Sequence, residues 1–121
     1  EVLRYEIINS HPGYLPNVRG LDALKWAILD GQPIGVTTHF IDEKPDAGTL
    51  IDRRFVPLNH SDSFDAVARR QYEMEIDMIV EAINKEPDGR ILRTDYSVSG
   101  RMNHNDELRM MIRFNKMISA I

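Results

Sequence analysis

An asparagine and a histidine stand two residues apart in the stretch Asn9-Ser10-His11-Pro12-Gly13-Tyr14-Leu15-Pro16. On an extended backbone, side chains two residues apart leave on the same side, so the Asn9 amide and the His11 imidazole would converge. Such donors can stabilise the oxyanion that forms when a carbonyl carbon is attacked. Asn, Ser, His and Pro also satisfy ordinary turn geometry. Spacing alone therefore leaves both a catalytic pair and a turn open.

The elements around this stretch predict where the two side chains would lie. Residues 5–9 are mostly apolar and predict a strand. Pro12 and Pro16 favour an extended, stiff loop after it. Residues 22–30 then show helical spacing, with Gly31 suited to the C-terminal cap. A strand, a loop and a helix in this order would place Asn9 and His11 at the carboxyl end of a strand, where open α/β sheets bind ligands.

A second polar cluster follows a second predicted strand. Residues 35–41 are β-branched and contain His39, and the Pro- and Gly-containing loop 42–48 carries Asp46. Read without further context, Pro-Asp-Ala-Gly is a turn and Asp46 a turn residue. The other predicted elements are a strand at 49–56 antiparallel to 35–41, a long helix from an Asp62 cap to about residue 85, an extended piece at 90–94, a loop at 95–105 and a terminal helix from Asp106.

Together the two clusters resemble the folate-dependent formyltransferases, which act on glycinamide ribonucleotide, methionyl-tRNA or amino sugars. The shared features are an Asn-x-His-Pro-x-x-Leu-Pro-x-x-Arg-Gly run at 9–20 and a Gly-Val-Thr-x-His segment from Gly35 that ends in Asp46-Ala47-Gly48. The resemblance implies an α/β fold with a Rossmann-like mixed sheet and flanking helices, of which we expect only the second half here. Residues 1–94 would form the catalytic-motif region, and residues 95–121 a loop and helix.

The resemblance also implies a reaction and its residues. A formyl group would pass from 10-formyltetrahydrofolate to an amine at a site of Asn9, His11 and Asp46, with no metal. Asp46 would orient and charge the imidazole or, through water, accept a proton. Arg19 and His39 are the candidate substrate-binding residues. Gly13 stands where many members have Ser and Ala47 where many have Gly or Thr, which points to local differences in the loops.

Composition and net charge limit the kinds of binding partner and the cellular location that we expect. The 121 residues carry a net charge of −4 with scattered basic residues, which gives no footprint of a nucleic-acid binder, so we expect a nucleic-acid partner only if the acceptor is a tRNA. There are no cysteines and no run of about 20 apolar residues, so we expect a cytoplasmic protein without a membrane partner.

Three interpretations stay open. The chain is the C-terminal half of a formyltransferase, a non-catalytic module that assembles with another chain, or a hydrolase of formyltetrahydrofolate that uses water as acceptor. The few predicted strands would leave an open sheet edge and apolar helix surface. We therefore expect the isolated chain to be inactive, and to cover that surface by self-association or with a missing N-terminal half. The acceptor is not readable from the residues.

Overall fold

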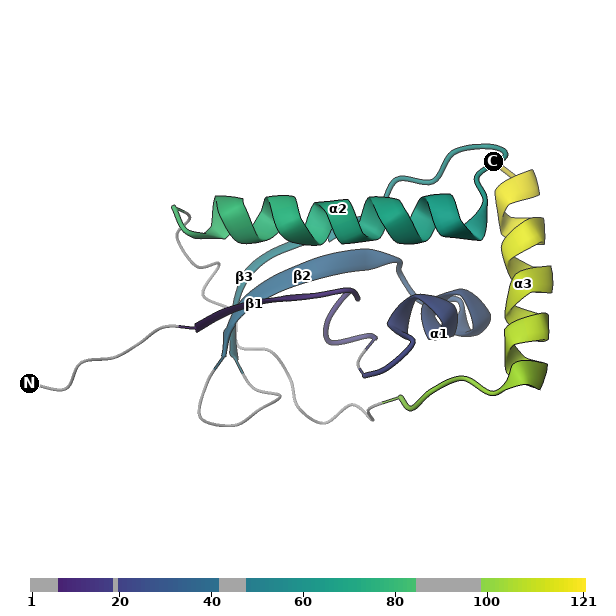
Figure 1. Cartoon of the computed structure of the whole chain (residues 1–121), viewed down its shortest axis with the longest axis horizontal. Helices are drawn as coiled ribbons and strands as arrows, with labels where there is room; N and C mark the ends of the chain where they lie inside the picture. Colours follow the sequence, from purple (N-terminus) through teal and green to yellow (C-terminus); the bar gives the residue numbers. More distant parts are fainter. Residues whose placement is uncertain (1–6, 19, 42–47, 85–98) are drawn as a thin grey trace, which may run out of the picture.

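The computed structural model describes residues 7–18, 20–41, 48–84 and 99–121. A long helix lies along one face of a small sheet, and the two other helices pack together at one end of it (Figure 1). The elements in chain order are β1 (Ile7–His11), α1 (Ala23–Asp30), β2 (Gly35–Ile41), β3 (Gly48–Phe55), α2 (Phe64–Ala82) and α3 (His104–Ser119).

The described strands form one antiparallel sheet in the order β1-β2-β3. The predicted antiparallel pairing of the second and third strands is confirmed. The first strand ends later than predicted, at His11 instead of Asn9. The reason is long-range: Asn9 pairs with His39 and His11 with Thr37, so hydrogen bonding to β2 extends the strand to the proline. Asn9 and His11 therefore stand within the last residues of a strand and not in a turn after it.

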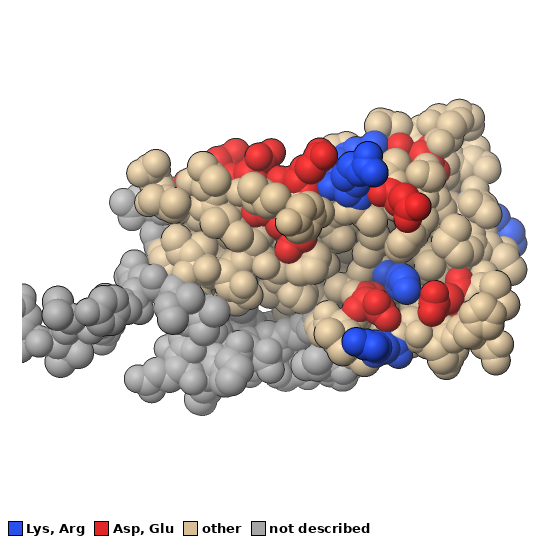
Figure 2. All heavy atoms as spheres, in the orientation of Figure 1, with Lys and Arg blue, Asp and Glu red and all other residues tan. Residues whose placement is uncertain are grey.

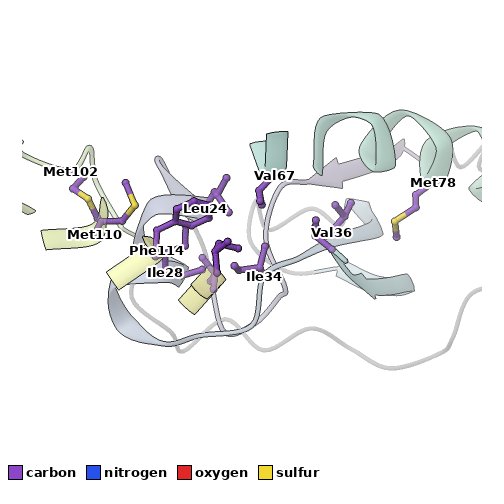
Figure 3. Packing of buried hydrophobic residues seen from close by; sticks show 14 residues of the cluster. Leu24, Ile28, Ile34, Val36, Val67, Met78, Met102, Met110 and Phe114 are labelled. Atoms are coloured by element: carbon purple, nitrogen blue, oxygen red, sulfur yellow. The ribbon is translucent and has the colours of Figure 1, made fainter. Parts of the chain in front are cut away.

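Apolar packing fixes α2 on the sheet and α3 on α1. Val36 of β2 is fully buried in one core cluster with Val67 and Met78 of α2, and Figure 3 shows these side chains facing one another. The same cluster continues into the α1–α3 contact, whose buried members include Leu24, Ile28, Met110 and Phe114. The predicted terminal helix is confirmed, beginning at His104 because Asn103 caps it by accepting a hydrogen bond from the Asp106 backbone N–H.

The start of α2 differs from the prediction in its capping residue. Ser63, not Asp62, accepts the hydrogen bond from a first-turn backbone N–H, that of Ala66. The carboxylate of Asp62 instead receives two hydrogen bonds from the Arg70 guanidinium, at 2.8 and 3.0 Å, and one from the Asn59 backbone N–H. The hydrogen bonds from Arg70, and then that from Asn59, lower the pKa of Asp62 from 3.8 to about 2. Asp62 thus ties the loop before α2 to the second turn of the helix.

Several predictions fall outside the described residues. These are Asp46 with its loop, Arg19 and the extended piece at 90–94. Within the part of the chain that the structure describes, no helix is long and apolar enough to span a bilayer.

Candidate functional site

The two faces of the sheet carry different chemistry. Residues directly opposite one another in antiparallel strands share a face, and the register places five polar residues on the face away from α2: Asn9, His11, Thr37, His39 and Arg53. We call this the site face. The other, which α2 covers, carries Ser10, Val36, Thr38 and Arg54 and is called the helix face.

Asn9 and His39 are direct cross-strand neighbours on the site face. The Asn9 side chain is exposed, whereas His39 is buried, with its Nδ1 3.3 Å from the Phe40 carbonyl oxygen. Cross-strand neighbours have Cβ atoms about 5 Å apart, so the exposed amide stands beside the buried imidazole. This arrangement leaves the Asn9 amide available to a ligand and gives His39 the place of a supporting residue.

His11 is held by the loop that follows it. Its Nε2 lies 3.1 Å from the Val18 carbonyl oxygen. A carbonyl oxygen only accepts hydrogen bonds, so Nε2 carries a proton in this contact. Gly13 makes the contact possible, because a Cβ at this position would lie 2.9 Å from both His11 Nε2 and the Val18 oxygen. The departure from serine noted in the sequence therefore has a steric reason in this chain.

Thr37 fixes the same loop from the sheet side. Its hydroxyl donates to the Gly13 carbonyl at 2.8 Å and accepts from the Leu15 backbone N–H at 3.0 Å. Thr37 is fully buried and pairs with His11 across the strands. Both hydrogen-bonding roles of its hydroxyl are thus filled by loop backbone, and the loop is held by the cross-strand neighbour of His11.

Arg53 of β3 lies opposite Thr37, so His11, Thr37 and Arg53 form one row across the sheet. It donates to the Leu15 carbonyl at 2.9 Å and lies over the Tyr14 ring, with its guanidinium carbon 4.8 Å from the ring centroid. Tyr14 in turn stacks on Phe55 at 4.8 Å between centroids. These contacts are a cation–π pair and an offset stack that secure the outer side of the loop.

The structure brings three of the five predicted site residues, Asn9, His11 and His39, onto one face. The convergence of Asp46 with them stays a prediction, as does the role of Arg19, because both lie outside the described residues. Sequence analysis missed Thr37 and Arg53 as loop-positioning residues. Nothing in the sequence around Thr37 or Arg53 marks this role, because only the register of the three strands aligns them with His11.

A cavity of about 710 Å³ lies elsewhere, between α1 and α3. Its walls include Ile28 and Ile34 on one side and Ile112, Arg113 and Lys116 on the other. None of the site-face residues lines it. The candidate site is therefore the site face of the sheet and not this cavity.

Comparison with known proteins gives a consistent result. The sequence model described as "Formyl transferase" matches residues 1–83. A dTDP-4-amino-4,6-dideoxyglucose formyltransferase of Mycobacterium tuberculosis is 30% identical over 108 residues, which cover 89% of this chain and 46% of that protein. A methionyl-tRNA formyltransferase of Thermodesulfovibrio yellowstonii is 32% identical over 92 residues, which cover 75% of this chain and 30% of that protein.

A solved structure shows the same fold. The formyltransferase PseJ from Anoxybacillus kamchatkensis, determined in complex with UDP-4,6-dideoxy-4-formamido-L-AltNAc and tetrahydrofolate, superposes with a TM-score of 0.64 at 28% identity. The match covers 76% of this chain and 51% of PseJ. The chain thus spans about half, or less, of the length of these proteins. The expected α/β fold and family resemblance are confirmed.

Proposed function

Because the chain belongs to the formyl transferase family, we propose that its site face takes part in moving a formyl group from 10-formyltetrahydrofolate to an amine. The observation that carries the proposal is the placement of Asn9, His11 and His39 on one face at the end of β1. An exposed amide beside a fixed imidazole fits a folate that presents a formyl carbonyl, because both groups can donate hydrogen bonds to its oxygen. The folate supplies the activated formyl carbon when it is bound.

Each residue has a distinct proposed role. The exposed amide of Asn9 donates a hydrogen bond to the carbonyl oxygen as negative charge develops on it. During the reaction, the N–H at Nε2 of His11 leaves the Val18 carbonyl oxygen and donates to the same developing oxyanion. The contact with Val18 fixes the plane of the ring before the substrate binds. Buried His39 supports Asn9 from the neighbouring strand. We assign to Asp46 the carboxylate that charges the His11 imidazole, and to Arg19 an anionic group of the acceptor.

The acceptor we propose is the amino group of a nucleotide-linked sugar. Support comes from the similarity to the M. tuberculosis and Anoxybacillus sugar enzymes, which extends over 89% and 76% of this chain. A tRNA acceptor would require a basic surface, and the chain has a net charge of −4.

Two substitutions test the site in the active protein that contains this chain. Asn9→Ala and His11→Ala should each slow single-turnover formyl transfer by about 100-fold or more, the usual cost of a lost oxyanion donor or of a positioned acid or base. The matched control is His60→Ala, since His60 is exposed and its Nδ1 contacts the Ile121 carbonyl oxygen, away from the sheet. Near-normal turnover in both test variants would show that the site face does not carry the reaction.

The same assay separates transfer from hydrolysis. Release of formate from 10-formyltetrahydrofolate without any amine, at the rate measured with the sugar acceptor, would identify water as the acceptor. We expect formate release to be slower than transfer. If neither reaction occurs, the interpretation as a non-catalytic module replaces the proposal.

A further inference from the structure

The segment before α3 is hydrogen-bonded to the segment before α1. The Leu21 backbone N–H donates to the Ser99 carbonyl oxygen at 3.0 Å, and the Ser99 hydroxyl donates to the Leu21 carbonyl oxygen at 3.0 Å. Gly20 and Ser99 also form a parallel β-bridge. We call residues 99–102, with the hydrogen bonds that they make to residues 20–26, the anchor. It joins two segments that lie 78 residues apart along the chain.

Asp22 gives up the usual features of a helix N-cap to take part in the anchor. It precedes α1, but its φ of 52° is left-handed, and its side chain caps no N–H of α1 among the described residues. An N-cap aspartate normally has an extended backbone and accepts a hydrogen bond from the first turn. Here the carboxylate accepts from the Met102 backbone N–H instead, at 2.8 Å. A strained backbone of this kind persists only where the surrounding structure holds it, and it is found most often at functional sites.

A charged contact also reaches the carboxylate of Asp22. Its Oδ1 lies 3.9 Å from Lys25 Nζ, which lies 3.4 Å from Glu107 Oε2 of α3. Figure 2 shows acidic and basic side chains next to one another at the end of the molecule that α1 and α3 form. These side chains are partly exposed, so the attraction between them is weak. The charge-assisted hydrogen bond from Met102 is therefore the main interaction of the Asp22 carboxylate.

Trp26 adds a further hydrogen bond to the anchor, because its indole N–H donates to the Gly100 carbonyl oxygen at 2.8 Å. Met102 is buried and belongs to the core cluster that also contains Val18 and Leu24. The anchor thus combines apolar burial with hydrogen bonds of fixed direction. Both kinds of interaction act close to Val18.

The anchor begins next to the part of the β1–α1 loop that sets His11. The sheet holds the first half of this loop through Gly13 and Leu15. The second half contains Val18, whose carbonyl oxygen lies 3.1 Å from His11 Nε2. One residue separates Val18 from Gly20, where the anchor begins. Burial of the Val18 side chain fixes its place, whereas the direction of its carbonyl group depends on the backbone that the anchor restrains.

We propose that Asp22 is a positioning residue for formyl transfer. Through the anchor it fixes the Val18 carbonyl group, and that group holds the His11 ring with its proton on Nε2. Without the carboxylate, the Val18 carbonyl turns more freely and the ring loses the contact that sets its plane and its tautomer. The proposal rests on the function proposed above, because His11 must donate to the developing oxyanion for its orientation to affect the rate.

Asp22→Gly tests the proposal in the active protein that contains this chain. Glycine adopts a left-handed backbone without strain, so the substitution removes only the carboxylate. We expect single-turnover formyl transfer to slow by about tenfold, because displacement of a catalytic group by less than 1 Å already costs rate. The KM for the folate should stay within about twofold, since a positioning residue acts on the transition state and not on substrate binding.

Two further variants serve as controls. Asp22→Asn keeps an oxygen that accepts from the Met102 N–H, and asparagine tolerates the left-handed backbone, so its rate should stay within about twofold of the wild type. Ser63→Ala is the matched control, because it removes a side-chain acceptor at the N-terminus of another helix, α2. A loss of rate in Ser63→Ala equal to that in Asp22→Gly would overturn the proposal.

The tautomer of His11 separates positioning from a general loss of stability. Long-range 1H–15N correlation spectra at about pH 8, where imidazoles are ordinarily neutral, report which ring nitrogen carries the proton. We expect the Nε2–H form in the wild type, Asp22→Asn and Ser63→Ala, and a mixture of both tautomers in Asp22→Gly. Unchanged His11 signals in Asp22→Gly would overturn the proposal. Changed signals at an unchanged rate would leave Asp22 as the anchor of the ring and overturn the role of His11 in formyl transfer.

Discussion

The two faces of the sheet differ in how their buried polar side chains are bonded. On the helix face, Val36 is fully buried against α2, while the hydroxyls of Ser10 and Thr38 are buried without a hydrogen-bond partner among the described residues. On the site face, the equally buried Thr37 uses its hydroxyl twice, to Gly13 and to Leu15. Apolar contact, with one buried hydrogen bond from Gln71 Nε2 to the Gly35 carbonyl at 3.1 Å, holds the helix, whereas hydrogen bonds to Thr37 hold the loop. Only the second kind of interaction fixes the direction of a side chain such as His11.

The largest effect is expected from adding one methyl group to the loop that holds His11. In Gly13→Ala, the new Cβ would meet His11 Nε2 and the Val18 carbonyl oxygen at 2.9 Å, so the imidazole must leave its position. Misplacement of a catalytic group by about 1 Å can cost about 100-fold. We expect a loss of that order in single-turnover formyl transfer, with the folate and acceptor saturating.

Gly100→Ala is the matched control for this substitution. A Cβ at Gly100 would meet no atom within 4 Å, so formyl transfer should stay within about twofold of the wild type. If Gly13→Ala is equally harmless, the orientation of His11 by Val18 has no part in the reaction.

A smaller effect is expected from breaking the hydrogen bonds of Thr37. Thr37→Val preserves the shape of the side chain but leaves the Leu15 N–H and the Gly13 carbonyl without their partner. An unsatisfied buried group costs about 1–3 kcal/mol, so we expect the free energy of unfolding to fall by about 2 kcal/mol. Urea unfolding followed by circular dichroism measures the change. Unchanged stability would mean that the loop finds other partners.

Thr38→Val makes the same change one residue later, on the helix face. The Thr38 hydroxyl is buried without a partner in the described structure, so its removal ends a desolvation cost and loses no hydrogen bond. We expect the free energy of unfolding to rise by about 1 kcal/mol in the same urea experiment. A loss as large as that of Thr37→Val would show that the two faces do not differ in this respect.

The sequence predicted the features that depend on local interactions and missed those that depend on contacts between residues far apart in the chain. Helical spacing located α2 and α3 to within a few residues, and the motif located Asn9, His11 and His39, because these signals are local. The extension of β1 to His11 and the role of Thr37 depend on pairing with strands more than twenty residues away. The choice of Ser63 over Asp62 as cap was equally hidden, since Arg70 must be in place to engage Asp62.

The smallest expected effect concerns the loop before α2, which Asp62 ties to the helix. The Arg70 guanidinium and the Asn59 N–H lower the pKa of Asp62 from 3.8 to about 2. A lowered carboxyl pKa stabilises the fold fully above 3.8, and this contribution is lost as the pH falls through 2. Thermal unfolding between pH 5 and 2 should therefore show a smaller loss of stability in Asp62→Asn than in the wild type. Arg70→Gln, which removes the partner, should reduce the pH dependence in the same way. A wild-type pH dependence in both variants would show that the ion pair does not stabilise the fold.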